Sequence, residues 1–241
     1  MSIIKQTLTY FKLSAEFLIR NPAISSIFIV IRDYPAWLTY IKPGKNSVNT
    51  SMPWITFGAI NAIARKLRPD MKIFEYGSGG STLFWASRVQ SVISIEHDQV
   101  WYTKLKKDLQ ERKVTNVQYF LIEASPDASF SKKNRSDPSH YISDDQQYSG
   151  FNFDQYVKKI EDYSDNYFDI VVVDGRARPS CIHHALDKIK PSGYLVVDNS
   201  DRDYYFSDIV IDNTKWKRTD YKGSVPFSNF YSQTSILQKL S

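Results

Sequence analysis

The chain has 241 residues, of which 42% are hydrophobic, and a formal net charge of +5. This length suits one large α/β domain with additions. The single cysteine, Cys181, excludes an internal disulfide framework and indicates a reducing compartment, so we expect a cytoplasmic protein. We expect neither a membrane-spanning helix nor a signal peptide, because the longest apolar run near the start covers only residues 27–31.

The positive charge is unevenly distributed along the chain. Residues 1–70 contain nine Lys and Arg against three Asp and Glu, whereas residues 71–241 contain 22 against 23. A basic N-terminal region predicts peripheral contact with an anionic membrane surface or an acidic partner. The sequence shows no nucleic-acid-binding motif, so no nucleic-acid partner is expected.

Residues 1–52 predict a helical cap that packs on the main domain, residues 53–241. Prolines interrupt this aromatic and basic region at positions 22, 35 and 43, and residues 8–20 place apolar side chains at helical spacing. A membrane-surface contact or a dimer contact is the alternative role for this amphipathic helix. Pro53 opens a second predicted helix, Trp54–Leu67.

From Met71 onward, predicted strands and helices alternate. Strands this apolar are expected to be buried on both faces, which indicates a parallel, doubly wound α/β sheet. Two β-like runs near the end predict an antiparallel pair. The predicted strands are Lys72–Tyr76, Ser91–Ile95, Val117–Ile122, Phe168–Val173, Gly193–Val197, Trp216–Tyr221 and Tyr231–Gln238. The predicted helices are Thr82–Val89, Gln99–Arg112, Phe153–Tyr163, Ser180–Ile189 and Tyr204–Ile211.

One polar segment, residues 124–150, does not fit this alternation. It is too long for an ordinary connection in an α/β unit, so we interpret it as an insertion. Long loops that follow the carboxyl end of a strand are either mobile linkers or substrate lids. We expect the second of these, a lid over the molecule that the protein would act on.

The stretch KIFEYGSGGST, residues 72–82, joins a buried strand to a helix through three glycines. Glycine permits positive φ angles and lets a ligand approach the main chain, so this turn indicates a nucleotide or cofactor site. The dinucleotide fingerprint G-x-G-x-x-G fits at Gly77 and Gly79 but fails at Thr82. A tight strand-to-helix turn without a ligand is the alternative.

A second acid, Glu96, ends the next predicted strand in the stretch SIEHD. A carboxylate beside the glycine-rich turn suits the two hydroxyls of a ribose. His97 follows and could lie against a purine, or it could be a solvated loop residue. For Glu96 the alternative is a charge at a helix N-terminus.

The stretches FEYGSGGST, SIEHD, FDIVVVDG and GYLVVDN, in that order, resemble class I S-adenosylmethionine-dependent methyltransferases over residues 53–240. The resemblance implies a Rossmann-like, seven-stranded sheet in the order 3-2-1-4-5-7-6, with the last strand antiparallel. It implies that the glycine turn lies beneath the methionine part of the cofactor. The implied cofactor-binding residues are Glu75, Gly77, Ser78, Gly79, Gly80, Ser81, Glu96, His97, Glu123, Ala124 and Asp174.

The acceptor is expected beyond the fourth long strand, where Asp174 is followed by Arg176 and Arg178. Ligands of open α/β sheets lie beyond the carboxyl ends of the strands, so all three side chains should face the pocket. The two arginines could bind a carboxylate or phosphate together, or they could form ion pairs with nearby acids. His183 and His184 follow on a helix, where one could act as a base.

The fifth strand ends in Asp198 and Asn199. Together with Asp174 they resemble the metal site of catechol- and caffeoyl-type O-methyltransferases. Their oxygen atoms would suit Mg²⁺, whereas Arg176 could occupy the same space instead. Asp198 and Asn199 could also simply cap the next helix.

The sequence therefore predicts a methyltransferase acting on an oxygen of a small molecule or glycan. Asp174, Arg176, Asp198 and Asn199 are the candidate catalytic residues. An aminopropyl transferase of similar fold and a non-catalytic cofactor-binding module are the alternatives. The turn and Glu96 argue against the module, and Gly175 and Arg176 replace the acidic pattern typical of aminopropyl transferases.

Overall fold

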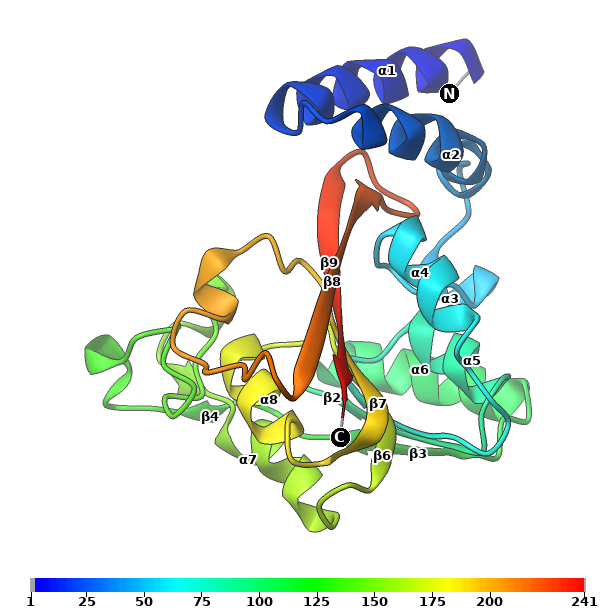
Figure 1. Cartoon of the computed structure of the whole chain (residues 1–241). Helices are drawn as coiled ribbons and strands as arrows, with labels where there is room; N and C mark the ends of the chain where they lie inside the picture. The colour runs from blue at the N-terminus through cyan, green and yellow to red at the C-terminus, as the bar shows by residue number, and fades with distance from the viewer. Residues whose placement is uncertain (1–2, 241) are drawn as a thin grey trace.

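The computed structural model describes residues 3–240 and contains a seven-stranded sheet in the order β3-β2-β1-β6-β7-β9-β8 (Figure 1). A two-stranded pair, β4 and β5, lies apart from it. Without this small pair, the order is the predicted 3-2-1-4-5-7-6, and the last strand, β9, is antiparallel to both neighbours. The strands are β1 (Lys72–Tyr76), β2 (Ser91–Glu96), β3 (Val117–Leu121), β4 (Ser125–Pro126), β5 (Phe151–Asn152), β6 (Phe168–Val173), β7 (Ile189–Val197), β8 (Trp216–Ser224) and β9 (Tyr231–Lys239).

Helices cover both faces of the sheet, as expected for a doubly wound fold. The α-helices are α1 (Ile3–Arg20), α2 (Ile24–Tyr40), α3 (Ser47–Thr50), α4 (Phe57–Ala64), α5 (Gly80–Ala86), α6 (Gln99–Glu111), α7 (Asp154–Lys158) and α8 (Arg178–Ala185). Short 3₁₀ helices are η1 (Phe130–Lys132), η2 (Gln146–Tyr148), η3 (Lys159–Asp162) and η4 (Asp203–Tyr205).

Alternate side chains of the central strands supply two separate cores. Phe74 and Val171 join the core beneath α7 and α8. Their neighbours Ile73 and Ile170 join the core beneath α4, α5 and the α1–α2 hairpin. Because successive strand residues point to opposite faces, a strand buried on both sides is mostly apolar. β6 is buried along its whole length, and its one charged residue, Asp169, pairs with Lys190 at 2.9 Å.

The register of the parallel strands brings three acids and the first glycine of the turn to one edge. Tyr76 of β1 lies opposite Ile95 of β2 and Val173 of β6, and Val173 lies opposite Val197 of β7. The last residue of β2 and the residues that directly follow β1, β6 and β7 therefore lie at the same edge of the sheet. These four residues are Gly77, Glu96, Asp174 and Asp198.

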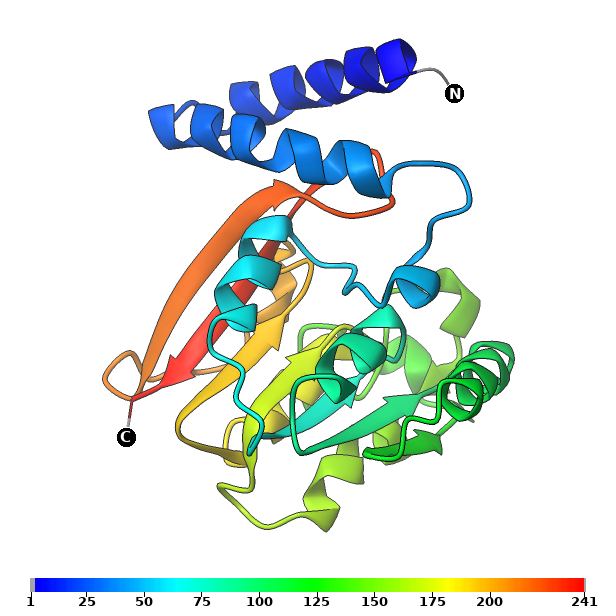
Figure 2. The ribbon, with the colours of Figure 1, turned by 90° about the vertical axis from the view of Figure 1, so that its right-hand side faces the viewer.

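The N-terminal helices α1 and α2 form a hairpin that packs on the end of the β8–β9 ribbon, away from the helices beside the parallel strands (Figure 2). Trp37 is 1% exposed, and its indole N–H donates to the carbonyl oxygen of Ser228 at 2.8 Å. Asp33 is also 1% exposed and accepts from the backbone N–H of Ser224 at 3.2 Å. These contacts fix the hairpin to the sheet.

Several predicted elements differ from the observed ones. Helix α2 was not predicted, because Pro35 was interpreted as an interruption, yet the helix continues through it. The predicted helix Tyr204–Ile211 is wrong, since only the 3₁₀ turn η4 forms there. The predicted helix Phe153–Tyr163 divides into α7 and η3, and the helix after Pro53 is only Phe57–Ala64.

Within residues 3–240, no helix is long and apolar enough to cross a membrane. The hairpin helices are amphipathic, since each combines buried, apolar and charged positions.

Replacing Trp37 by Ala should lower the free energy of unfolding by about 3–5 kcal/mol, because it removes a buried aromatic side chain and its hydrogen bond. Urea unfolding measures this change. Ile31→Ala on the same helix is the matched control: Ile31 is 65% exposed, so its loss should cost less than about 0.5 kcal/mol. Equal effects of the two substitutions would contradict the described packing of α2.

Candidate active site

The candidate site lies at the carboxyl edge of the sheet, where two adjoining cavities open. Cavity A is about 340 Å³ and cavity B about 350 Å³. Ser78, Trp101 and Asp174 line both cavities and so mark the place where they meet. Cavity A is also lined by Ser47, Trp54, Gly79, Gly80, Ser81, Asp198, Asn199 and Phe230. Cavity B is also lined by Gly77, Glu96, His97, Asp98, Gln147, Tyr148, Gly175, Arg176 and Arg178.

Two glycines of the turn after β1 are required by their surroundings. Gly77 has a φ of +88°, and a Cβ atom there would lie 2.8 Å from the backbone of Gly175. A Cβ atom at Gly80 would lie 1.9 Å from the carbonyl oxygen of Ser47. The turn is therefore packed between the exit loop of β6 and helix α3, and side chains at these positions would force the three segments apart.

Glu75 stabilises the turn from beneath. It is fully buried, and its carboxylate accepts hydrogen bonds from Thr82 Oγ1 at 2.5 Å, Ser94 Oγ at 2.6 Å and Trp85 Nε1 at 2.9 Å. Burial raises the pKa of Glu75, and these hydrogen bonds partly oppose the rise. Glu75 lines neither cavity A nor cavity B, so its carboxylate holds the protein's own turn and helix α5.

Thr82 explains why the dinucleotide pattern fails at its third position. Its hydroxyl accepts from the backbone N–H of Gly79 at 3.1 Å and donates to Glu75. A glycine at position 82 would leave the Gly79 N–H and the Glu75 carboxylate without the Thr82 hydroxyl as a partner. The turn therefore uses a side chain where dinucleotide-binding folds use close backbone packing.

Glu96 ends β2 and points toward the turn. It accepts from Ser78 through the backbone N–H at 3.2 Å and the hydroxyl at 2.7 Å, and from the backbone N–H groups of His97 and Asp98 at 2.8 and 3.0 Å. Burial would raise the pKa of Glu96, but the hydrogen bonds from His97, Asp98 and Ser78 outweigh it and lower the pKa. Glu96 is therefore ionised at neutral pH, at the wall of cavity B.

His97 connects Glu96 to the insertion. Its Nε2 accepts from Arg176 Nε at 3.2 Å, and its Nδ1 lies 2.9 Å from Glu96 Oε1. Because an arginine nitrogen only donates, Nε2 must carry a lone pair, and the proton sits on Nδ1 toward the carboxylate. The imidazole edge also packs against Tyr148, with ring centroids 5.2 Å apart.

The insertion, residues 124–150, lies over cavity B. Asp145 forms an ion pair with Arg176 at 3.0 Å, and the Arg176 guanidinium lies 5.5 Å from the centre of the Tyr148 ring. Gln147 and Tyr148 line cavity B and not cavity A. Gln147 and Tyr148 thus cover the side of Glu96 and His97, whereas residues 142–144 line a smaller cavity with Arg178 and Asn199. The role of this segment as a lid stays a prediction.

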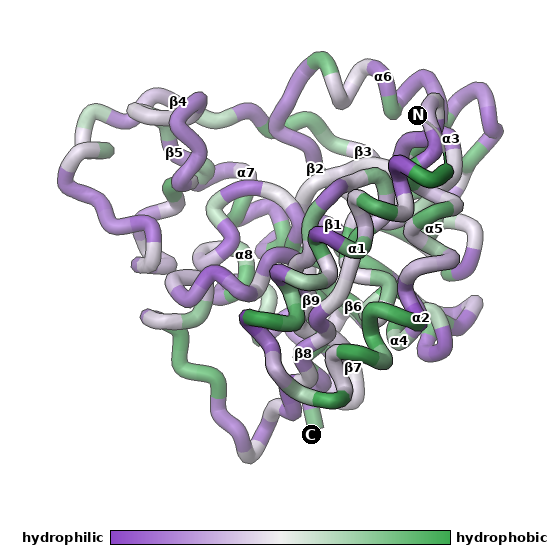
Figure 3. The backbone as a smooth tube through the Cα atoms, turned by 90° about the horizontal axis from the view of Figure 1, so that it is seen from above, coloured by the Kyte–Doolittle hydropathy of each residue, from purple (hydrophilic) through white to green (hydrophobic). Residues whose placement is uncertain are grey.

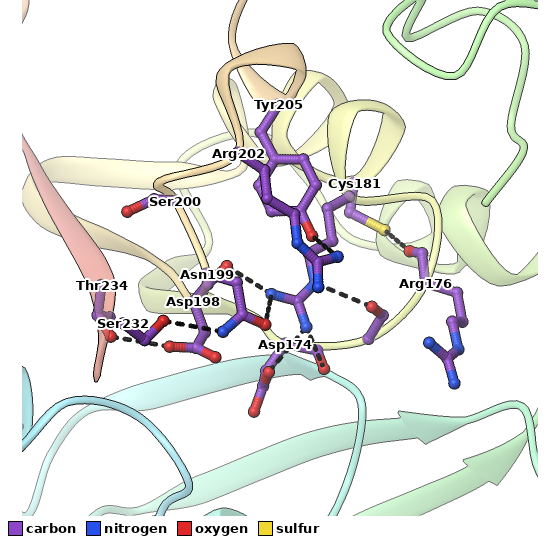
Figure 4. A network of polar contacts seen from close by, with 12 residues as sticks. Asp174, Arg176, Cys181, Asp198, Asn199, Ser200, Arg202, Tyr205, Ser232 and Thr234 are labelled. Carbon is purple, nitrogen blue, oxygen red and sulfur yellow. Dashed lines mark hydrogen bonds and ion pairs between the residues drawn. The ribbon is translucent and has the colours of Figure 1, made fainter. Parts of the chain in front are cut away.

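Arg178 is the centre of a polar network with Asp174, Asp198 and Asn199, which Figure 4 labels. Its guanidinium forms an ion pair with Asp174 at 3.0 Å and donates to Asn199 Oδ1 at 3.1 Å and to the carbonyl oxygen of Asp198. Asn199 in turn donates to Ser232 Oγ at 3.0 Å. Arg178 thus joins the exits of β6 and β7.

The two strand-end acids influence each other. Burial, and then the neighbouring Asp198 carboxylate, raise the pKa of Asp174 against the lowering effect of Arg178. Burial also raises the pKa of Asp198, which accepts from Thr234 Oγ1 at 2.8 Å. Asp174 lines both cavities, so a carboxylate with a raised pKa lies where they meet.

The candidate metal ligands do not fit a Mg²⁺ site as they are arranged. The carboxamide oxygen of Asn199 and one carboxylate oxygen of Asp174 face Arg178, and a guanidinium occupies the position that a cation would take. Within residues 3–240, no group of three or more His, Cys, Asp and Glu side chains is placed to hold a metal ion. The competing cation is Arg178, whereas the sequence suggested Arg176.

The predicted arginine pair is also corrected. Figure 4 shows Arg176 to one side of Asp174 and Asn199. Its guanidinium forms an ion pair with Asp145 of the insertion at 3.0 Å. Both arginines line cavity B, but their guanidinium groups serve different partners, and neither forms an ion pair with Asp201 or Asp203. They therefore connect parts of the protein and do not form a joint anion site.

Some candidate residues lie away from the two cavities. Glu123 is exposed, and neither it nor Ala124 lines cavity A or B. His183 is exposed, and His184 Nδ1 lies 2.7 Å from Glu161. Cys181 is buried, and its thiol donates to the carbonyl oxygen of Arg176.

Several residues that line the cavities were not among the predicted site residues, including Trp101, Ser47 and Phe230. Trp101 lies in the first turn of α6, and its Nε1 donates to the carbonyl oxygen of Ser78 at 2.9 Å. Ser47 and Phe230 reach cavity A from α3 and from the β8–β9 connection. Their sequence surroundings carry no motif, since only the folded chain brings them to the strand ends.

Comparison with solved structures finds proteins of the same architecture. The O-methyltransferase TomG from Streptomyces achromogenes, in complex with S-adenosylmethionine, is 15% identical, with a TM-score of 0.56 over 87% of this chain and 96% of that one. An rRNA methylase from Streptococcus thermophilus is 13% identical, with a TM-score of 0.53 over 76% and 95%. A proposed methyltransferase from Streptococcus mutans, in complex with S-adenosylhomocysteine, is 12% identical, with a TM-score of 0.50 over 72% and 91%. Comparisons with protein families and with curated proteins find no match.

The chain has the class I methyltransferase fold. The strand order and the antiparallel last strand agree with the expectation from the sequence motifs. Within this methyltransferase fold, the glycine turn, Glu96 and Asp174 occupy the exits of three adjacent strands, which is where open α/β sheets bind ligands.

Arg178→Met should lower the free energy of unfolding by about 3 kcal/mol, because the Asp174 and Asp198 acids would lose the guanidinium between the two strand exits. Chemical unfolding at neutral pH measures the loss. Arg176→Met is the control: its side chain is 33% exposed, so its ion pair should contribute less than about 1 kcal/mol. If Arg176→Met proves the more damaging change, Arg178 is not the residue that joins the exits.

Proposed function

We propose that this protein is an S-adenosylmethionine-dependent methyltransferase that acts on an oxygen atom of a small molecule or glycan. The observation that carries the proposal is the continuity of the site. The turn at Gly77–Gly80 and Glu96 border a cavity that meets a second one at Asp174. The neighbours that bind S-adenosylmethionine or S-adenosylhomocysteine support this cofactor.

Cavities A and B suit the two ends of such a cofactor. Ser78–Ser81 would hold the methionine part in cavity A, and Glu96 would accept hydrogen bonds from the ribose hydroxyls in cavity B. Ser78 Oγ already donates to Glu96 at 2.7 Å, so a ribose hydroxyl would replace this internal donor. His97 and Tyr148 would then flank the purine.

The chain's own contribution is orientation, proton removal and exclusion of water. Bound S-adenosylmethionine supplies an electrophilic methyl group, so the protein has to align an acceptor hydroxyl with it. Asp174 lies at the junction of the cavities, and burial raises its pKa, which suits a group that accepts the hydroxyl proton near neutral pH. Arg178 would keep this carboxylate in position, and Asp198 and Asn199 would border the acceptor.

A third cavity supports a glycan-like acceptor. Cavity C, of about 650 Å³, shares Phe230 with cavity A. Polar side chains and aromatic rings line it together, including Asn21, Asn229, Gln233 and Tyr231. Such a mixture suits a sugar, which has hydroxyl groups at its rim and apolar C–H faces.

The other functions considered have less support. The rRNA methylase neighbour suggests a nucleic-acid acceptor, but four acids line cavity C (Glu16, Asp201, Asp203 and Asp220) against three cations (Arg20, Arg218 and Lys222), so it offers a phosphate backbone no net attraction. An aminopropyl transferase and a binding module without catalysis are the remaining alternatives. Methyl transfer in the assay below separates both from the proposal.

Glu96→Ala should weaken the binding of S-adenosylhomocysteine by about 1–3 kcal/mol, the range for losing hydrogen bonds to a charged group. Isothermal titration calorimetry of both proteins measures the difference. Glu123→Ala is the matched control, since Glu123 is exposed and lines neither cavity A nor B; its affinity should equal that of the wild type. No binding by the wild type would reject the proposed cofactor.

Asp174→Asn should bind S-adenosylhomocysteine as the wild type does but transfer methyl groups about 10²–10⁴ times more slowly, because it cannot accept the hydroxyl proton. Release of S-adenosylhomocysteine in the presence of a panel of glycans and phenols gives the rate. Wild-type turnover in the variant would remove Asp174 from the proton step. Transfer of an aminopropyl group, or no transfer to any hydroxyl compound, would favour the alternatives.

A further inference from the structure

The α1–α2 hairpin exposes an apolar surface that the fold of the domain does not use. Of the fifteen large hydrophobic residues that are exposed in residues 3–240, nine lie in these two helices. They are between 49% and 80% exposed. The nine residues, here called the outer face, are Ile3, Ile4, Leu8, Phe11, Ile19, Ile24, Ile27, Phe28 and Ile31.

The outer face is separate from the side of the hairpin that packs on the sheet. Tyr10 and Phe17 of α1 are buried, and the ring of Phe17 stacks on Tyr231 with centroids 4.4 Å apart. In α2 the buried positions include Val30 and Trp37. Apolar segments recur along both helices when they are seen from above (Figure 3). A surface that exposes this many large apolar side chains usually marks an interaction site.

Basic side chains border the outer face. Lys5 and Lys12 lie one helical turn to either side of Leu8 on α1, and Arg20 follows Ile19. Residues 1–52 contain six Lys and Arg against two acids. One of these acids, Asp33, is buried and pairs with Arg32 at 2.8 Å, which leaves Glu16 as the exposed acid of the hairpin.

We propose that the outer face of the hairpin docks on an anionic lipid bilayer. A helix with a wide apolar face bordered by Lys and Arg lies in the plane of the interface, with its apolar side chains among the acyl chains and its cations at the headgroups. Helix α1 supplies the apolar side chains together with the cations Lys5, Lys12 and Arg20, and α2 adds further apolar side chains beside it. Trp37 and Asp33 fix this hairpin to the β8–β9 ribbon. It therefore presents a rigid amphipathic surface.

The charges favour a bilayer over a second copy of the chain. In a twofold dimer the same patch faces itself, so Lys5 and Lys12 of one copy would approach the same basic rim of the other. Anionic headgroups instead complement the rim. They also tolerate a flat apolar surface, since acyl chains adapt to the side chains that enter them.

Vesicle flotation with the full-length protein tests the docking. Wild-type protein should float with vesicles of phosphatidylcholine and phosphatidylglycerol, bind pure phosphatidylcholine at least about tenfold more weakly, and dissociate as salt is raised. Leu8→Glu with Phe28→Glu should reduce binding to the mixed vesicles by at least about tenfold, because two apolar anchors become acids. The two residues are 65% and 67% exposed, so the melting temperature should not change.

A matched control places two acids elsewhere. Val100 and Val210 are 79% and 90% exposed and lie outside the hairpin, so Val100→Glu with Val210→Glu should bind vesicles like the wild type. An equal loss in this control, no flotation of the wild type, or equal binding to neutral vesicles would each overturn the proposal. So would a dimer, seen by sedimentation velocity, that Leu8→Glu with Phe28→Glu dissociates.

Discussion

The close approach of two strand exits is the constraint on which the site depends. The turn after β1 and the loop after β6 meet where Gly77 faces Gly175, with room for no side chain between them. The backbone N–H of Asp174 donates to the carbonyl oxygen of Tyr76 at 2.9 Å, and the N–H of Gly77 donates to that of Ile95 at 3.0 Å. Because the exits are held this closely, the polar residues that follow share one edge and border connected cavities.

The acids near this edge differ in their hydrogen-bond partners and in the direction of their pKa shifts. Glu75 faces inward and organises the turn, whereas Glu96 faces cavity B with a lowered pKa. Burial raises the pKa values of both Asp174 and Asp198, the Asp198 carboxylate adds to the rise at Asp174, and Arg178 opposes both. One edge therefore carries an acid that stays ionised beside acids that hold protons more readily, which is a common basis for distinct roles in binding and proton transfer.

The fold could be predicted from the sequence because its signals are local. Apolar runs such as 168–173 can only be doubly buried strands, and the turn at Gly77 follows one of them directly. Helix α2 could not be predicted in this way, since its continuation through Pro35 depends on the packing of Trp37 on a connection nearly two hundred residues later. The same limit applies to Ser47 and Phe230, whose place at cavity A depends on tertiary structure alone.

The direction in which each arginine side chain points could not be predicted from the sequence either. Arg176 and Arg178 are two residues apart and looked interchangeable, but α8 begins at Arg178 and turns that side chain toward β7, whereas Arg176 reaches the insertion. Only the distances to Asn199 and Asp145 separate their roles.

The hydrogen bonds of Glu96 also bear on the stability of the domain when no ligand is bound. The hydroxyl and backbone N–H of Ser78 donate to one carboxylate oxygen of Glu96, and the N–H groups of His97 and Asp98 donate to the other. The protein itself therefore solvates this buried charge. For this reason the domain can fold without a bound small molecule. The site can remain vacant without collapsing.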